Sequence, residues 1–155
     1  MLNFLIILIL CLIINPKVSD ADYYWIKWLE RSDSVTYVDF GNSTLKGSSL
    51  NYYSINDFQR DKLTNGFKWK SMIANMSLDC NDMSNTILSL KYFRENMGNG
   101  SEMYSYSLTK SEQEQIRKIE MPGSNSYRQL SNFCEIVIKS DIIELQDYWR
   151  QLSQK

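Results

Sequence analysis

The fold is decided by the last stretch of the chain, residues 121–155, which reads MPGSNSYRQLSNFCEIVIKSDIIELQDYWRQLSQK. Apolar side chains recur in it at spacings of three and four, the period that places side chains on one face of a helix. The stripe consists of Tyr127, Leu130, Cys134, Val137, Ile138, Ile142, Leu145, Trp149 and Leu152. After Gly123 the stretch contains no further Gly or Pro. We therefore predict a long amphipathic C-terminal helix over about residues 124–152.

The start of this helix is better defined than its interior. Pro122 and Gly123 break the preceding chain, and Ser124 is a suitable N-cap because its side-chain oxygen can accept a backbone N–H. Ser140 and Asp141 interrupt the apolar stripe, and short polar side chains compete with the helix for backbone hydrogen bonds. The helix therefore either continues to its end or bends and restarts near Asp141.

The two cysteines of the main chain predict a covalent link to this helix. Cys134 lies on the apolar stripe, and Cys80 is the only other cysteine outside the N-terminal segment. We predict that they form a disulfide, which suits an oxidising compartment outside the cytoplasm. A redox-active pair is the alternative, but the two are not arranged as Cys-x-x-Cys, the arrangement typical of such pairs.

The N-terminal segment has the pattern of a secretory signal. Residues 1–14 are almost wholly apolar, and Pro16 and a small-x-small site ending at Ala21 follow. We predict a signal peptide over residues 1–21 and no permanent membrane span, because the apolar run is shorter than the ~20 residues that a span needs. No Lys or Arg precedes the run, so an uncleaved N-terminal anchor remains the alternative. Cys11 follows Leu10 and not a small residue, which argues against lipidation there.

The charge and length of the remaining chain exclude some classes of protein. Residues 22–155 have the length of a single ordinary domain with one core. The formal net charge of the full sequence is −1, so there is no strongly basic field for nucleic acid. We expect neither nucleic-acid binding nor a membrane-surface helix.

The middle of the chain predicts a sheet. Runs rich in aromatic and β-branched residues predict about six strands, at residues 23–29, 35–40, 50–55, 67–78, 86–93 and 102–108. Residues 41–49 and 56–66 have the composition of loops, and Thr109 and Glu112 have the spacing of a capping box that opens a short helix through Ile119. Consecutive hairpins favour an antiparallel meander. The predicted class is α+β, with the C-terminal helix packed on one face of the sheet and tethered by the disulfide.

Several of these features together resemble the surface-adhesin protein E family of exported bacterial proteins. The resemblance is carried by Trp25, Tyr37-Val38-Asp39, Ser71, Asp79-Cys80, Tyr92, Met97-Gly98-Asn99-Gly100, Ile119, Pro122-Gly123-Ser124, Leu130 and Cys134. It implies a small antiparallel sheet with a C-terminal helix tied to it by a disulfide. It also implies a bacterial envelope protein, and the best-known members of the family bind host extracellular-matrix proteins. The chain departs from the family in continuing well past Cys134 and in lacking an evident lipid-attachment cysteine.

The residue types present argue against catalysis. The sequence contains no histidine, which removes the usual general base and the usual metal ligand. If Cys80 and Cys134 pair, no thiol nucleophile remains in the main chain. Asp39 and Asp79 are the best-placed carboxylates, and their positions are more typical of structural roles. No phosphate loop, dinucleotide fingerprint or calcium loop is present, so we predict no enzyme, no cofactor and no metal site.

Bases and aromatic residues interleave in one stretch, which we take as the candidate partner-binding patch. The patch is Arg60, Lys62, Lys68, Trp69 and Lys70, flanked by Phe58 and Phe67. Cations beside aromatic faces are typical of protein-binding hot spots. The alternative is that Trp69 packs in the core and the charges form a solvated rim.

Three functions are compatible with these features. The first is an exported adhesin-type protein that binds a protein partner, such as a host matrix protein. The second is a periplasmic structural or accessory protein with no host ligand, and a small enzyme is a distant third. Aromatic-rich edge strands would also allow a homodimer.

Overall fold

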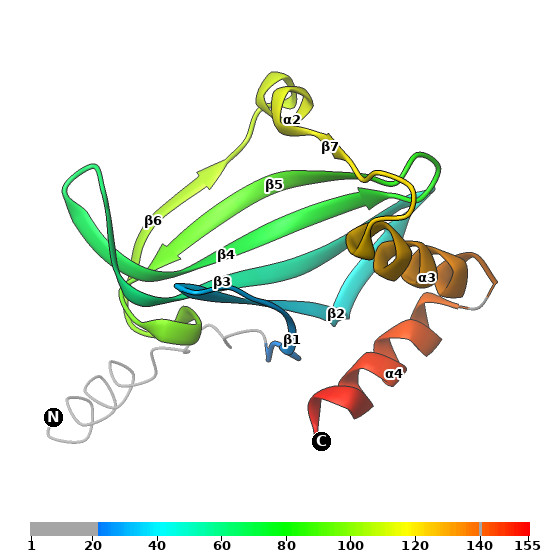
Figure 1. Ribbon diagram of the computed structural model, residues 1–155, viewed down its shortest axis with the longest axis horizontal. Helices are drawn as coiled ribbons and strands as arrows, with labels where there is room; N and C mark the ends of the chain where they lie inside the picture. The colour runs from blue at the N-terminus through cyan, green and yellow to red at the C-terminus, as the bar shows by residue number, and fades with distance from the viewer. Residues whose placement is uncertain (1–21, 140) are drawn as a thin grey trace, which may run out of the picture.

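The computed structural model describes residues 22–139 and 141–155. The predicted signal peptide lies outside the described residues. The elements follow in the order β1 (Ile26–Glu30), β2 (Ser34–Lys46), β3 (Ser49–Thr64), β4 (Phe67–Asp79), β5 (Ser84–Phe93), the 3-10 turn η1 (Asn96–Gly98), β6 (Glu102–Ser107), α2 (Lys110–Ile116), β7 (Lys118–Ile119), α3 (Asn125–Lys139) and α4 (Ile142–Ser153). The strands form one curved layer, with α3 and α4 against one of its ends (Figure 1).

The sheet is an antiparallel meander. Its strand order is β1-β2-β3-β4-β5-β6, and the short β7 pairs with the beginning of β5. Every neighbouring pair is antiparallel, as consecutive hairpin connections require. The predicted α+β class with an antiparallel meander and a C-terminal helix is confirmed.

Two segments predicted as loops are strands, and that prediction was wrong. Residues 41–46 belong to β2 and residues 56–64 to β3, so both strands run much further than their apolar cores. Each extension follows a β-bulge, between Asp39 and Thr44 in one strand and between Asp57 and Lys62 in the other. A bulge interrupts the alternation of inward and outward side chains from which a strand is recognised in a sequence.

The core lies between one end of the sheet and the two C-terminal helices. Its buried members are Val38, Phe40, Leu50, Tyr52, Leu78, Met83, Leu130, Cys134, Val137, Leu145 and Trp149. Phe40 is at its centre, because its ring stacks on Tyr52 at 4.6 Å and lies 4.4 Å from Phe133 and 4.9 Å from Trp149. Burial of each such side chain stabilises the fold by about 1.5–3 kcal/mol.

The C-terminal stretch forms two helices, which is the restart that Asp141 allowed and not one continuous helix. At the start of α3 the Ser124 hydroxyl accepts the Tyr127 N–H at 3.0 Å, which confirms the predicted N-cap. Asp141 is the N-cap of α4 and accepts the Ile143 N–H at 3.3 Å. A separate α4 can lie across β2, where the Gln146 side-chain amide donates to the Ser43 carbonyl at 2.7 Å.

The predicted disulfide is confirmed. Cys80 directly follows β4 and Cys134 lies on the buried face of α3, with their Cα atoms 5.5 Å apart. The bond therefore joins the helical layer to the end of a central strand.

The segment between β6 and α3 is predicted correctly at its start and wrongly at its end. The capping box of Thr109 and Glu112 is present and opens α2. The helix ends at Ile116, however, and Lys118 and Ile119 pair with Asn85 and Ser84 of β5. The sheet edge supplies backbone partners there that a longer helix would have left unused.

The buried Tyr52 makes stability depend on pH in alkaline solution. Burial raises the pKa of Tyr52 to about 12, and its hydroxyl accepts a hydrogen bond from the Asn85 side chain at 2.7 Å. The unfolded value is near 10, so the native state keeps a proton that the unfolded chain loses, and stability falls as pH rises from about 10 towards 12.

We therefore expect the free energy of unfolding to drop by about 1 kcal/mol more in the wild type than in Tyr52→Phe between pH 9 and pH 11. Urea unfolding at the two pH values measures this difference. The variant is the necessary reference because the pKa values of Tyr92 and Tyr106 are also raised. Equal losses in both proteins would contradict the assignment to Tyr52.

Candidate protein-binding surface

The predicted patch lies on a hairpin at the end of the sheet remote from α3 and α4 (Figure 1). Residues 62–64 of β3 pair with residues 67–69 of β4 around a turn formed by Asn65 and Gly66. Both turn residues have positive φ, 49° and 83°, as a tight two-residue hairpin turn requires. We call the end of the sheet formed by residues 58–70 and 92–104 the hairpin end.

Trp69 and Lys62 are engaged within the protein. The Trp69 side chain is only 8% exposed, and its ring lies 5.3 Å from Phe58 and 4.8 Å from Tyr92. The Lys62 ammonium lies 4.6 Å from the centre of the Phe58 ring and 2.9 Å from the Asp33 carboxylate. Trp69 thus packs among neighbouring rings, as the alternative interpretation expected. It stabilises the hairpin and does not itself form the exposed surface.

The other three predicted residues present charge to solvent. Arg60 and Lys68 are exposed and Lys70 is half-buried. Among the described residues none of the three forms an ion pair. They are therefore available to a partner.

Arg94 joins this set, and it was missed in the sequence. Its guanidinium donates to the Lys68 carbonyl at 3.2 Å, and like Lys70 it has no carboxylate partner among the described residues. Pairing of Ser71 with Phe93 brings the end of β5 beside the hairpin. The signal that could have found Arg94 is this strand register, which one sequence does not reveal.

A short loop at the hairpin end, residues 95–99, is held in place by several hydrogen bonds. The Asp57 carboxylate accepts the Met97 N–H at 2.8 Å and the Asn96 side-chain amide at 3.0 Å. The Ser71 hydroxyl donates to the Glu95 carbonyl at 2.6 Å and accepts the Gly98 N–H at 2.9 Å. These bonds hold Met97 at φ 56°, a conformation that costs a non-glycine residue about 1–3 kcal/mol.

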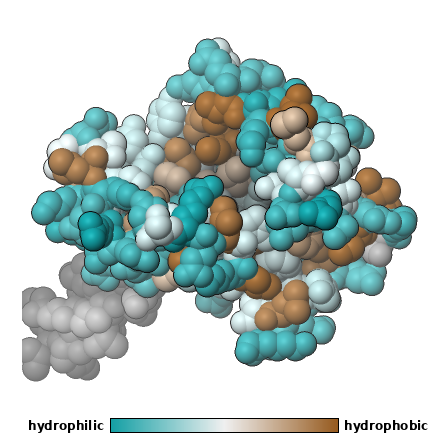
Figure 2. All heavy atoms as spheres, viewed as in Figure 1, coloured by the Kyte–Doolittle hydropathy of each residue, from teal (hydrophilic) through white to brown (hydrophobic). Residues whose placement is uncertain are grey.

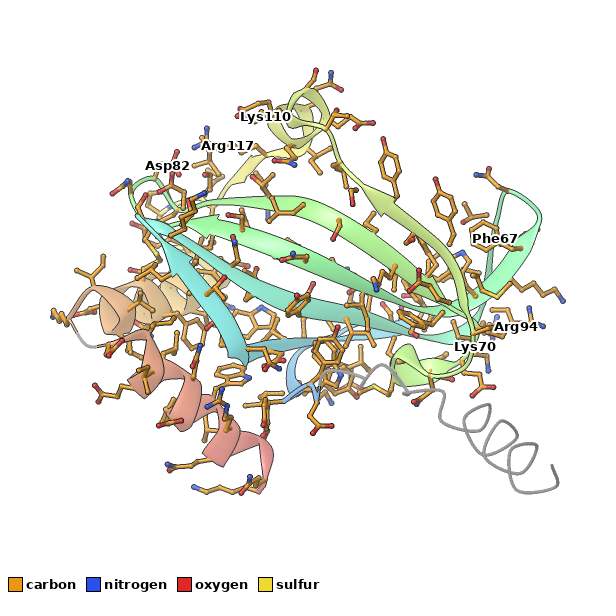
Figure 3. The ribbon with its side chains drawn as sticks, turned by 180° about the vertical axis from the view of Figure 1, so that it is seen from behind. Phe67, Lys70, Asp82, Arg94, Lys110 and Arg117 are labelled. Carbon is orange, nitrogen blue, oxygen red and sulfur yellow. A yellow bond between two sulfur atoms is a disulfide. The ribbon has the colours of Figure 1, made fainter. Side chains whose placement is uncertain are left out.

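The loop and the hairpin enclose a surface groove of about 460 Å³. The groove is lined by Asp61, Lys70, Arg94, Glu95, Asn96 and Asn99. Figure 3 shows Lys70 and Arg94 at the same end of the molecule as Phe67. The charged and amide groups of the groove suit recognition of a polar partner. The described part of the chain holds no group of three or more His, Cys, Asp or Glu that could bind a metal.

Gly98 is the position in this loop where a side chain has no room. A Cβ there would lie 2.8 Å from Cδ1 of the buried Ile73, and φ is +72°. Gly66 has φ +83° but nothing within 4 Å of an added Cβ. We expect Gly98→Ala to lower the free energy of unfolding by about 2–3 kcal/mol and Gly66→Ala by about 1 kcal/mol. Urea unfolding of both variants measures the difference, and equal effects would contradict the close contact with Ile73.

Asp39 and Asp79 have structural roles. Asp39 is fully buried and accepts both the backbone N–H of Asn42, at 3.2 Å, and its side-chain amide, at 2.7 Å. Asp79 accepts the Asn81 N–H at 3.0 Å at the end of β4. Both carboxylates thus shape the backbone beside them.

A second polar cleft, of about 250 Å³, lies between α2 and the sheet and is less suited to a charged partner. Its cation is Arg117, whose guanidinium is already ion-paired with Asp82 and lies 4.0 Å from the Glu114 carboxylate. Figure 3 shows Arg117 and Asp82 together, away from the hairpin end. The hairpin end therefore remains the better candidate surface.

The outer surface is polar over much of the molecule. Figure 2 shows hydrophobic residues as separate groups among hydrophilic ones, and the hairpin end on its left is mainly hydrophilic. In the described part of the chain, no helix combines the length and apolar character needed to cross a membrane.

Comparison with known proteins places the chain in a family. The family model for surface-adhesin protein E matches residues 25–135. A crystal structure of protein E from non-typeable Haemophilus influenzae has a TM-score of 0.53 and 12% identity, covering 82% of this chain and 97% of that one. A second structure of Haemophilus influenzae protein E has a TM-score of 0.50 and 13% identity, covering 75% and 97%. At such identities these likenesses show the fold alone.

No curated protein matches the chain. Helix α4 lies beyond the residues that the family model matches. The model nevertheless covers more than half of the chain, and the chain therefore belongs to the surface-adhesin protein E family.

Proposed function

We propose that this protein is a non-catalytic adhesin of the bacterial envelope that binds a protein partner such as a host extracellular-matrix protein. The observation that carries the proposal is the family match over residues 25–135. The predicted signal peptide over residues 1–21 would export the chain, and the disulfide between Cys80 and Cys134 suits an oxidising compartment.

The hairpin end is the proposed binding surface. It presents Arg60, Lys68 and Lys70 on a projecting β-hairpin, and the aromatic rings around Trp69 hold that hairpin in place. Pre-organised charge on a rigid element favours recognition because little conformational freedom is lost on binding. In this proposal Trp69 and Lys62 hold the hairpin in place, since both are engaged within the protein.

Binding of purified residues 22–155 to immobilised laminin, fibronectin, vitronectin and collagen tests this function. We expect saturable binding to at least one of them, above binding to albumin, and a clear loss of it in Lys68→Glu. Lys110→Glu is the matched control, because Lys110 is an exposed lysine of α2 at a distance from the hairpin end (Figure 3). Absence of binding would contradict a matrix ligand, and equal losses in both variants would contradict the hairpin end as the surface.

A periplasmic structural or accessory role is the second candidate. It is favoured by Leu10 directly before Cys11, where a bacterial lipoprotein signal carries a small residue. Such a protein would have an envelope partner and no host ligand. Its location in the periplasm, and not on the cell surface, would distinguish it from an adhesin.

A homodimer is also part of the proposal. Strand β6 ends the strand order and all six of its residues are exposed, with Tyr104 and Tyr106 among them. An unpaired strand edge can pair with the same edge of a second copy. Sedimentation at increasing protein concentration measures the mass, and a monomer at every concentration would contradict the dimer.

A further inference from the structure

We propose that the groove at the hairpin end binds an acidic segment of polypeptide, whose carboxylates lie between Lys70 and Arg94. This inference rests on the proposed function and names the chemistry of its partner. The lining residues that matter are the two cations, the carboxylates of Asp61 and Glu95, and the amides of Asn96 and Asn99.

Four of the five cations of the hairpin end form no ion pair with a described residue, and Lys62 is the exception. Ion pairs engage Lys27, Lys62, Lys91, Arg117, Lys118, Lys139 and Arg150. In the described residues no carboxylate lies within ion-pair distance of the other four cations of the hairpin end, which are Arg60, Lys68, Lys70 and Arg94. Lys70 and Arg94 line the groove. A surface with an excess of unpaired cations favours a partner of opposite charge.

The carboxylates nearby do not cancel this excess. Asp61 and Glu95 line the groove, and a third carboxylate, Asp57, already accepts hydrogen bonds from Asn96 and Met97 beneath the loop. The groove lining itself holds two cations and two carboxylates, and the unpaired, exposed Arg60 and Lys68 of the same hairpin end add two further positive charges. The chain as a whole has a formal net charge of −1, so the hairpin end, with its unpaired cations, is more positive than the chain as a whole.

One of the two cations that would hold a carboxylate, Arg94, is oriented in advance. One N–H of the Arg94 guanidinium is bonded to the Lys68 carbonyl, which orients the side chain and leaves its other donors for a ligand. The floor is the loop held by Asp57 and Ser71, and the Asn99 side-chain amide donates to the Asn96 carbonyl within it at 3.0 Å. The bonded Arg94 and the held loop therefore lose little entropy when a ligand binds.

The position of the two carboxylates favours polypeptide over a continuous polyanion. A sulfated polysaccharide or a nucleic acid carries negative charge along its whole length and would be repelled by Asp61 and Glu95. A polypeptide can place single carboxylates against Lys70 and Arg94, with neutral or basic residues opposite the acids. Leu63, which is 69% exposed, and the half-buried Phe67 add apolar contacts beside the groove.

The experiment uses a random copolymer of glutamate and tyrosine as the probe, labelled with a fluorophore and titrated with purified residues 22–155. We expect saturable binding that weakens as salt is raised from 50 to about 300 mM, because exposed charges are screened. Arg94→Glu and Lys68→Glu should each weaken binding roughly fivefold, since an exposed pair contributes little and reversal adds repulsion. Lys110→Glu should leave it unchanged.

The test is most decisive where some variants should strengthen binding while others weaken it. Glu95→Gln and Asp61→Asn should each strengthen binding by roughly twofold, because they remove a repelling charge. Far-ultraviolet circular dichroism and thermal unfolding of every variant confirm that the sheet is intact. Absence of saturable binding, tighter binding of heparin than of the copolymer, or weaker binding in Glu95→Gln would each overturn the proposal.

The outcome of the copolymer titration can be distinguished from the outcome of the matrix-binding test. Copolymer binding without matrix binding would support the groove and contradict the host ligand. Matrix binding that is unaffected by Arg94→Glu would support adhesion and overturn the groove as its site.

Discussion

Replacement of Cys80 and Cys134 together by alanine is expected to lower the free energy of unfolding by about 4 kcal/mol. The two cysteines are separated by 54 positions, and the chain-entropy model gives this value for a loop of that size. Cys134 is only 4% exposed and lies in the core with Leu130 and Val137, so its loss also loosens α3 from the sheet.

Denaturant unfolding of the double variant and of the oxidised wild type measures this effect. Wild-type protein unfolded in a strong reductant is the matched control, because it lacks the bond and keeps both side chains. A loss of less than about 1 kcal/mol in both cases would contradict the bond as the main link between helix and sheet, because a disulfide typically contributes about 2–4 kcal/mol. Mass spectrometry of the native protein should show no free thiol at either cysteine.

Trp149→Ala is expected to lower the free energy of unfolding by about 3–5 kcal/mol. The side chain is 3% exposed, and its ring lies 4.9 Å from Phe40 and 5.4 Å from Phe133. Its indole N–H donates to the Tyr24 carbonyl at 2.9 Å and so joins α4 to the chain just before β1. Removal leaves a cavity and an unsatisfied carbonyl at the same place.

Two further variants on α4 separate the loss of the Trp149 ring from the loss of its hydrogen bond and from a general effect on the helix. Tyr148→Ala alters the exposed residue beside Trp149 on the same helix and should cost less than about 0.5 kcal/mol. Trp149→Phe keeps most of the ring but removes the donor to Tyr24, and should cost about 1–3 kcal/mol. Similar losses for Tyr148→Ala and Trp149→Ala would show that α4 is not docked as described.

The helical and covalent parts of the fold could be predicted because their signals are local. Spacing of three and four marks a helix face, and Ser124 and Asp141 carry side-chain oxygens at helix starts. The pairing of Cys80 with Cys134 followed from the absence of another cysteine in the main chain. The order of the strands followed from the expectation of consecutive hairpins, which favour an antiparallel meander.

The length of β2 and β3 could not be predicted in the same way. Their outer halves are polar and follow bulges, and what holds them as strands is pairing with a neighbour, such as Lys62 with Trp69. The candidate surface depended on the same long-range information. Arg94 and the loop held by Asp57 reach the hairpin only through strand pairing, so the predicted patch included Lys70 but no other residue that lines the groove.

The surface position of the protein is the central claim, and protease treatment of intact cells that express it tests that claim most directly. The fragments of the mature chain are followed by mass, with a known periplasmic protein in the same cells as the control for leakage. An adhesin should be digested on intact cells while the periplasmic control survives. Protection of the chain until the outer membrane is permeabilised would contradict surface exposure and leave a periplasmic role in its place.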